Sequence, residues 1–95
     1  MTVGMIAVHY PETGHFEDFV ARVRKVAAVM RATPGCLSAT YWADDAGEAV
    51  VSTVEWESDE AVAATYAALG TANVDVAFDT RERRPREIIR LRSLP

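Results

Sequence analysis

The chain has 95 residues, of which 49% are apolar and 25% charged, a balance typical of a single globular domain over residues 1–95. Its net charge of −4 argues against a nucleic-acid partner, although six of the ten basic residues lie in residues 81–92. The single cysteine, Cys36, excludes an internal disulfide, and no apolar run approaches the ~18 residues of a membrane span. We therefore expect a cytoplasmic protein without nucleic-acid or membrane partners.

The first half of the chain predicts a strand, a helix and a hairpin. Residues 3–10 are apolar on both alternating faces, which is typical of a strand covered on both sides. Apolar residues then recur at helical spacing over residues 16–30, and the Thr-Pro-Gly of residues 33–35 ends this helix. Residues 36–42 and 49–57 are rich in β-formers and flank a polar turn, so they predict a hairpin.

The second half predicts a helix and a closing strand. Ser58, followed by two acidic residues, is a suitable N-cap for a helix that we expect to end at Gly70. Residues 71–85 are ambiguous and fit one short helical face that ends at Pro85, and residues 86–94 predict the last strand. The order is that of an α+β fold of the ferredoxin-like split βαβ type, with a four-stranded antiparallel sheet.

This topology implies a partner subunit. Both helices of a split βαβ fold cover one face of the sheet, and the other face would carry many apolar side chains. We expect this second face to contain Ile6, Val8, Leu37, Ala39, Val51 and Thr53. Because so large an apolar surface is rarely left in water, we expect a homodimer in which two sheets pack face to face.

The signatures of common cofactors are missing. The two histidines are six residues apart and no thiols cluster, which argues against zinc or iron. No glycine-rich phosphate loop follows a strand, so the nucleotide and flavin fingerprints are absent. We therefore expect no cofactor and no metal.

A candidate pocket lies where the third strand meets the second helix. Trp56 shares a strand face with Ser52 and Val54, because strand side chains alternate. On the following helix Val62 and Tyr66 are one turn apart. An apolar space with a hydroxyl, an indole N–H and a phenol is typical of small-molecule sites, and plain core packing is the alternative.

A second candidate is His9, near the end of the first strand and on the same face as Met5. If that face points toward the helices, His9 lies at the rim of the pocket and is suited to act as a base. The alternative is a histidine on the surface.

The segments "PGCLSATYW", "AVV" and "EWESDEA" of residues 34–42, 49–51 and 55–61 resemble the antibiotic biosynthesis monooxygenase family. The resemblance implies a dimeric α/β barrel with a pocket between sheet and helices in each subunit. It also implies oxidation of an aromatic substrate by dioxygen without a cofactor.

The resemblance further implies a set of site residues. A tryptophan linked to the reaction matches Trp56, an asparagine position falls on Ser52, and a tyrosine position falls on Val62. Tyr66, one turn beyond Val62, is placed to fill the same space. An arginine position falls near Val76, in a poorly matched region.

The leading hypothesis is a cofactor-independent monooxygenase that oxidises a polycyclic aromatic or quinol-like molecule. The alternatives are a non-oxidative binding protein or isomerase or cyclase on the same barrel, and a structural or regulatory dimer without a ligand. The expected catalytic residues are Trp56, Ser52, Tyr66 and His9, and the expected substrate-binding residues are Val54, Val62 and Met5.

Overall fold

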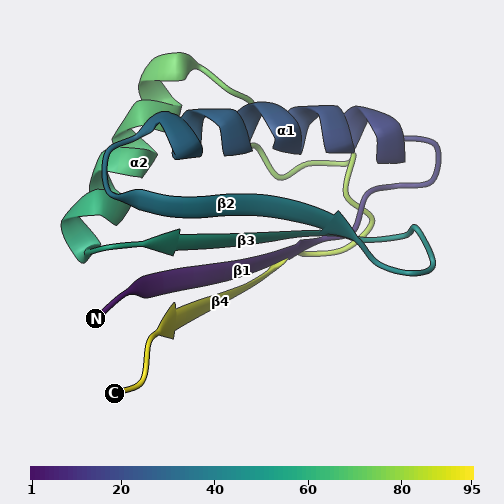
Figure 1. Ribbon diagram of the computed structural model, residues 1–95. Helices are drawn as coiled ribbons and strands as arrows, with labels where there is room; N and C mark the ends of the chain where they lie inside the picture. The colour runs from purple at the N-terminus through teal and green to yellow at the C-terminus, as the bar shows by residue number, and fades with distance from the viewer.

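The computed structural model describes residues 1–95 and contains four strands and two helices in the order βαββαβ (Figure 1). The strands are β1 (Val3–His9), β2 (Cys36–Ala43), β3 (Val50–Trp56) and β4 (Glu87–Arg92), and the helices are α1 (Phe16–Ala32) and α2 (Asp59–Ala72). The sheet order is β2-β3-β1-β4 and all neighbouring pairs are antiparallel. The expected ferredoxin-like α+β fold is confirmed. Neither helix is long and apolar enough to cross a membrane.

Both helices lie on the same side of the sheet, as Figure 1 shows. The register brings Ala7 of β1 opposite Ser52 of β3 and Ile88 of β4, so these three side chains share one face. Alternation along β1 and β3 therefore buries one set of side chains under the helices. The main core cluster consists of Met5, Ala7, Ala27, Met30, Ala39, Val54, Trp56, Ala61 and Leu69.

The placement of Ala39 corrects one sequence-based prediction. Ala39 lies opposite Val54 and is buried beneath the helices rather than on the second face. A register shift between Cys36 and Ser38 inserts Leu37 as an extra residue, which breaks simple alternation at the start of β2. Leu37 itself is exposed, as expected.

The turn before β2 depends on a glycine. Gly35 has a φ of +91°, which L side chains rarely adopt, and an added Cβ would come within 2.5 Å of the Ala61 Cβ. This close approach brings the start of β2 against the first turn of α2. Ser58 caps that turn by accepting a hydrogen bond from the Ala61 backbone N–H at 3.1 Å, which confirms the predicted cap.

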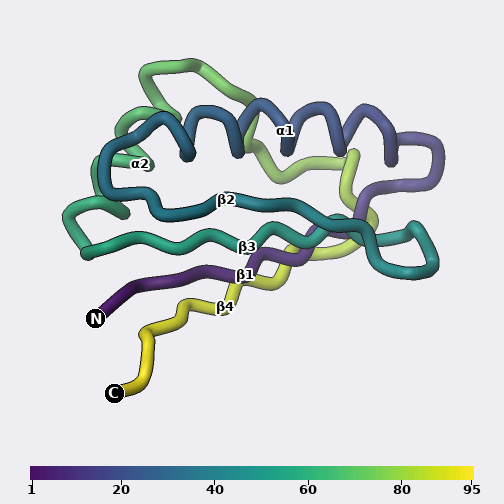
Figure 2. Tube along the Cα trace, viewed as in Figure 1, coloured from purple at the N-terminus to yellow at the C-terminus, as the bar shows by residue number.

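The predicted end of α2 and the short helix after it are both wrong. The helix continues past Gly70 to Ala72, and Asn73, whose backbone is left-handed (φ 56°), forms the C-cap. Residues 74–86 are not helical and connect α2 to β4, passing behind α1 in the view of Figure 2. The carboxylates of Asp75 and Asp79 accept hydrogen bonds from the backbone two residues ahead, and such local bonds compete with a helix.

The second face of the sheet is open in the single chain. Trp42 of β2 and Ile89 of β4 are 62% and 51% exposed, and Leu37 and Leu91 are exposed as well. All six residues of β4 are exposed. The sequence-based expectation of a homodimer rests on an apolar second face of this kind.

Candidate functional site

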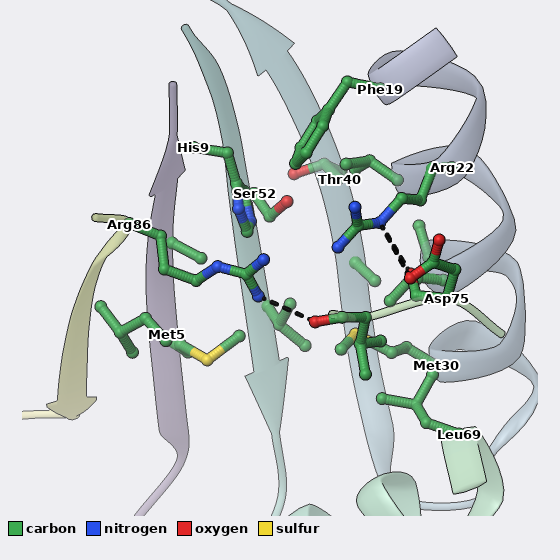
Figure 3. A pocket seen from close by; sticks show the side chains of 18 of the residues that line it. Met5, His9, Phe19, Arg22, Met30, Thr40, Ser52, Leu69, Asp75 and Arg86 are labelled. Atoms are coloured by element: carbon green, nitrogen blue, oxygen red, sulfur yellow. Dashed lines mark hydrogen bonds and ion pairs between the residues drawn. The ribbon is translucent and has the colours of Figure 1, made fainter. Parts of the chain in front are cut away.

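A cavity of about 140 Å³ lies between the sheet and α1. Thirteen of its 19 lining residues are hydrophobic, so the cavity is an apolar space with few polar groups. The sheet contributes Met5, Ala7, Ala39, Val54 and Ile88, and the helices contribute Phe19, Val23, Val26, Ala27, Met30 and Leu69. Its charged or titratable side chains are His9, Arg22, Tyr66, Asp75 and Arg86 (Figure 3).

A hydrogen-bonded chain of three side chains positions His9. Its Nδ1 lies 3.2 Å from Oε1 of Glu82, and the other carboxylate oxygen accepts a hydrogen bond from Nη2 of Arg86 at 2.5 Å. Because a carboxylate accepts, the neutral imidazole carries its proton on Nδ1 and leaves Nε2 free to accept a proton. Phe19 packs against the imidazole at 5.2 Å between ring centroids.

Burial lowers the pKa of His9 below its ordinary value, and the hydrogen bond to Glu82 opposes that shift. Nearby Arg86 and Arg22 lower this pKa further. His9 is therefore a neutral base at pH 7, with one ring nitrogen oriented by Glu82. That state and that orientation are what a general base requires.

Two arginines connect the cavity to the segment after α2. Arg22 donates from Nε to the Asp75 carbonyl at 2.8 Å and from Nη2 to the Ala77 carbonyl. Arg86 donates from Nη1 and Nη2 to the carbonyls of Val76 and Ala77, each at 3.1 Å. The loop of residues 75–77 is thus held over the cavity by side chains from α1 and from the residue preceding β4.

Each of these arginines keeps one nitrogen without a partner. Nη1 of Arg22 and Nε of Arg86 are both buried and make no hydrogen bond. Figure 3 shows both guanidinium groups pointing into the space between the sheet and α1, from opposite sides. Buried polar groups are normally paired, so two unpaired donors at one cavity indicate a place for an acceptor.

Five of the seven predicted site residues line the cavity, namely Met5, His9, Ser52, Val54 and Tyr66. The Tyr66 hydroxyl accepts a hydrogen bond from Nη2 of Arg90 at 3.0 Å and donates to the Met5 sulfur at 3.5 Å. The structure brings these side chains together, and their chemical roles stay predictions.

Trp56 and Val62 do not line the cavity, which corrects the predicted position of the pocket. Trp56 is 0% exposed, and its Nε1 donates to Oγ1 of Thr65 at 2.9 Å. The Thr65 hydroxyl in turn donates to the Ala61 carbonyl at 2.9 Å. Trp56 shares the face of Val54 but lies two residues further along β3, where α2 covers it, and Val62 packs against the same core.

The sequence-based reasoning missed Arg22, Glu82 and Arg86. The spacing of Asp18 and Arg22 predicts an ion pair on the exposed helix face, and this prediction is wrong because Arg22 lies under the loop of residues 75–77. One signal was available, since Arg22 occupies a position three residues after Phe19, on the apolar stripe of α1. Glu82 and Arg86 belong to the basic segment of residues 81–92, where no local pattern indicates that either side chain is buried.

Comparison with known proteins identifies the family. The sequence profile described as "Antibiotic biosynthesis monooxygenase" matches residues 2–66, about two thirds of the chain. The chain belongs to the antibiotic biosynthesis monooxygenase family. The match ends at residue 66, so Glu82, Arg86 and the loop of residues 75–77 lie beyond the part that the antibiotic biosynthesis monooxygenase profile describes.

Solved structures share the fold at low sequence identity. Rv0793 from Mycobacterium tuberculosis superposes with a TM-score of 0.87 at 20% identity, covering 100% of this chain and 97% of that one. PA3566 from Pseudomonas aeruginosa superposes with a TM-score of 0.84 at 20% identity, and the match covers 99% of this chain and 95% of that one. SnoaB from Streptomyces nogalater is described as a cofactor-independent oxygenase. It superposes with a TM-score of 0.80 at 16% identity, and the match covers 97% of this chain and 92% of that one. No curated protein matches the sequence.

Proposed function

We propose that this member of the antibiotic biosynthesis monooxygenase family is a cofactor-independent monooxygenase acting on a phenolic or quinol-like aromatic molecule. The observation that carries the proposal is the neutral His9, held by Glu82 beside two arginines in an apolar cavity. Family membership and the fold shared with SnoaB, described as a cofactor-independent oxygenase, support it.

The proposed chemistry uses the electrons of the substrate. Nε2 of His9 removes the hydroxyl proton, and the cationic side chains of Arg22 and Arg86 stabilise the resulting phenolate. The phenolate transfers an electron to dioxygen, and the two radicals combine at a ring carbon. One oxygen atom stays on that carbon and the other leaves as water, so a quinol and O2 give a hydroxyquinone and H2O. The apolar walls exclude bulk water from the reacting ring.

The other cavity residues have supporting roles in this proposal. Ser52 offers a hydroxyl where family relatives are expected to carry an amide, and Tyr66 offers a phenol at the cavity lining. Met5 and Val54 contact the flat ring. Phe19 replaces Trp56 as the aromatic wall, because Phe19 lines the cavity and the indole does not.

The experiment is dioxygen consumption by purified protein that has been stripped of flavin and metal. We expect uptake above the heat-denatured control with at least one quinol from a panel of dihydroxybenzoates, benzohydroquinone and naphthohydroquinone. A neutral buried base also suits a non-oxidative isomerase. That second candidate predicts conversion or deuterium exchange of the ligand at an undiminished rate under nitrogen.

We also propose that two copies of the domain pack through their open sheet faces to form a homodimer. Burial of even ~600 Å² of apolar surface contributes on the order of 15 kcal/mol before the costs of association. Light scattering should give about twice the 10.4 kDa chain mass. Ile89→Lys should shift the protein to monomer, because it places a charge in the exposed apolar face.

Ala64→Lys is the matched control for that prediction, since it places the same charge on the exposed surface of α2. It should leave the dimer intact. A wild-type mass equal to one chain at micromolar concentration would rule out this mode of assembly.

A further inference from the structure

We propose that the cavity recognises a single-ring aromatic acid, whose carboxylate lies between Arg22 and Arg86. This inference rests on the proposed function for the location of the site, and it names the class of substrate. Its basis is the pair of unpaired donors and the volume of the cavity.

The free donors match one carboxylate. The side chain of Arg22 is only 11% exposed, and its buried Nη1 has no partner. The remaining nitrogens of Arg22 bond to backbone carbonyls of the loop of residues 75–77. Arg86 likewise has both terminal nitrogens engaged and keeps a buried, unpaired Nε. One free nitrogen on each of two facing cations suits the two oxygens of a carboxylate.

The carboxylates near the cavity do not reach the unpaired nitrogens of the two arginines. Glu82 is fully buried and already bonds Arg86 and His9. Asp75 is 46% exposed and bonds Arg81 at 2.7 Å, whereas its carboxylate is 3.9 Å from Nε of Arg22. Asp75 therefore pairs with both Arg22 and Arg81, and Glu82 pairs with Arg86. The two arginines are thus balanced by two carboxylates, and an acid is recognised by their unpaired N–H donors rather than by an excess of positive charge.

The volume limits the size of the ring. The cavity of about 140 Å³ is close to the ~150 Å³ of an engineered apolar cavity in another protein that binds benzene. One ring fits such a space, and three fused rings do not fit without displacement of the walls. The structure therefore favours a smaller substrate than the polycyclic molecule that the sequence resemblance implied.

Calorimetric titration of the 95-residue protein with benzoate, benzamide and anthracene-9-carboxylate tests this inference. Benzamide has nearly the shape of benzoate without its charge. We expect benzoate to bind at least ~10-fold more tightly than benzamide, and the three-ring acid to bind more weakly than benzoate. Equal affinity for benzoate and benzamide, or tightest binding of the three-ring acid, would overturn the inference. This comparison in the wild-type protein needs no variant to fold.

Variants then assign the preference to the two arginines. Arg22→Gln and Arg86→Gln should each reduce benzoate affinity at least ~10-fold and leave benzamide affinity nearly unchanged. Arg24→Gln is the matched control, because Arg24 lies on the same helix, is exposed and bonds Tyr41 outside the cavity. Loss of benzoate binding in Arg24→Gln, or its full retention in both cavity variants, would contradict the assignment.

The outcome is separable from the proposed oxidation. Benzoate has no oxidisable hydroxyl, so its binding does not depend on oxygen chemistry. Selective benzoate binding without oxygen uptake would refute only the monooxygenase proposal. Oxygen uptake with neutral quinols and no preference for acids would refute only the inference about the carboxylate.

Discussion

Replacement of His9 by asparagine should lower kcat for quinol oxidation by about 10²- to 10⁴-fold, the usual contribution of a general base. The asparagine amide can still donate to Glu82 in place of Nδ1–H, so the hydrogen-bonded chain to Arg86 is kept. What is lost is the basic Nε2. Initial rates of dioxygen consumption measure the effect, and ligand affinity should change by less than about threefold, since the cavity walls are unaltered.

His15→Asn is the matched control for this prediction. His15 is exposed before α1 and does not line the cavity, so its replacement should leave the rate unchanged. A rate in His9→Asn equal to that of the wild type would exclude His9 as the base.

The pH profile gives an independent check on His9. The reaction needs the neutral imidazole, so kcat/KM should fall as the pH is lowered through the pKa of His9. Burial depresses that pKa, so the midpoint should lie below 6.5, the ordinary value for histidine. His9→Asn should lack this acidic limb.

Truncation of Trp56 should produce the largest loss of stability in the chain. Trp56 is 0% exposed and anchors β3 to α2 through its hydrogen bond to Thr65, so Trp56→Ala should lower the free energy of unfolding by about 3–5 kcal/mol. Trp56→Phe keeps most of the volume and should cost about 1–3 kcal/mol. Urea denaturation measures both, and the folded Phe variant should bind benzoate as the wild type does.

Two threonines provide the matched comparison for that bond. Thr65→Val removes the acceptor for the indole N–H and should cost about 1–3 kcal/mol, because a buried donor is left unpaired. Thr71→Val makes the same change at an exposed position of α2 and should change the free energy of unfolding by less than about 0.5 kcal/mol. Loss of benzoate binding in a folded Trp56→Phe variant of unchanged stability would contradict this account and would show that the indole belongs to the binding site.

The parts of the fold that local signals determine were predictable from the sequence. The β-forming residues 49–57 indicated β3, and Ser58 followed by two acidic residues marked the start of α2. The end of α2 was missed because Asn73, not Gly70, adopts the left-handed cap. The position of Ala39 was missed because nothing local signals the bulge at Leu37.

The site was harder to predict because long-range contacts assemble it. His9 and Glu82 are 73 residues apart, and Arg22 meets the loop of residues 75–77 more than 50 residues later. Arg22 and Arg86 appear in the sequence as ordinary surface charges, and only the folded chain buries them. Strand alternation and the family resemblance both placed the pocket at Trp56, two residues along β3 from Val54, which lines the cavity.

Labelling with ¹⁸O2 tests the central claim most directly. Purified protein without flavin or metal is mixed with the quinol panel under ¹⁸O2, and product and water are examined by mass spectrometry. We predict one ¹⁸O atom in the hydroxyquinone and one in water, at a rate that His9→Asn reduces at least ~100-fold. A product that contains no ¹⁸O, or one that forms equally fast with His9→Asn, would contradict the proposed mechanism.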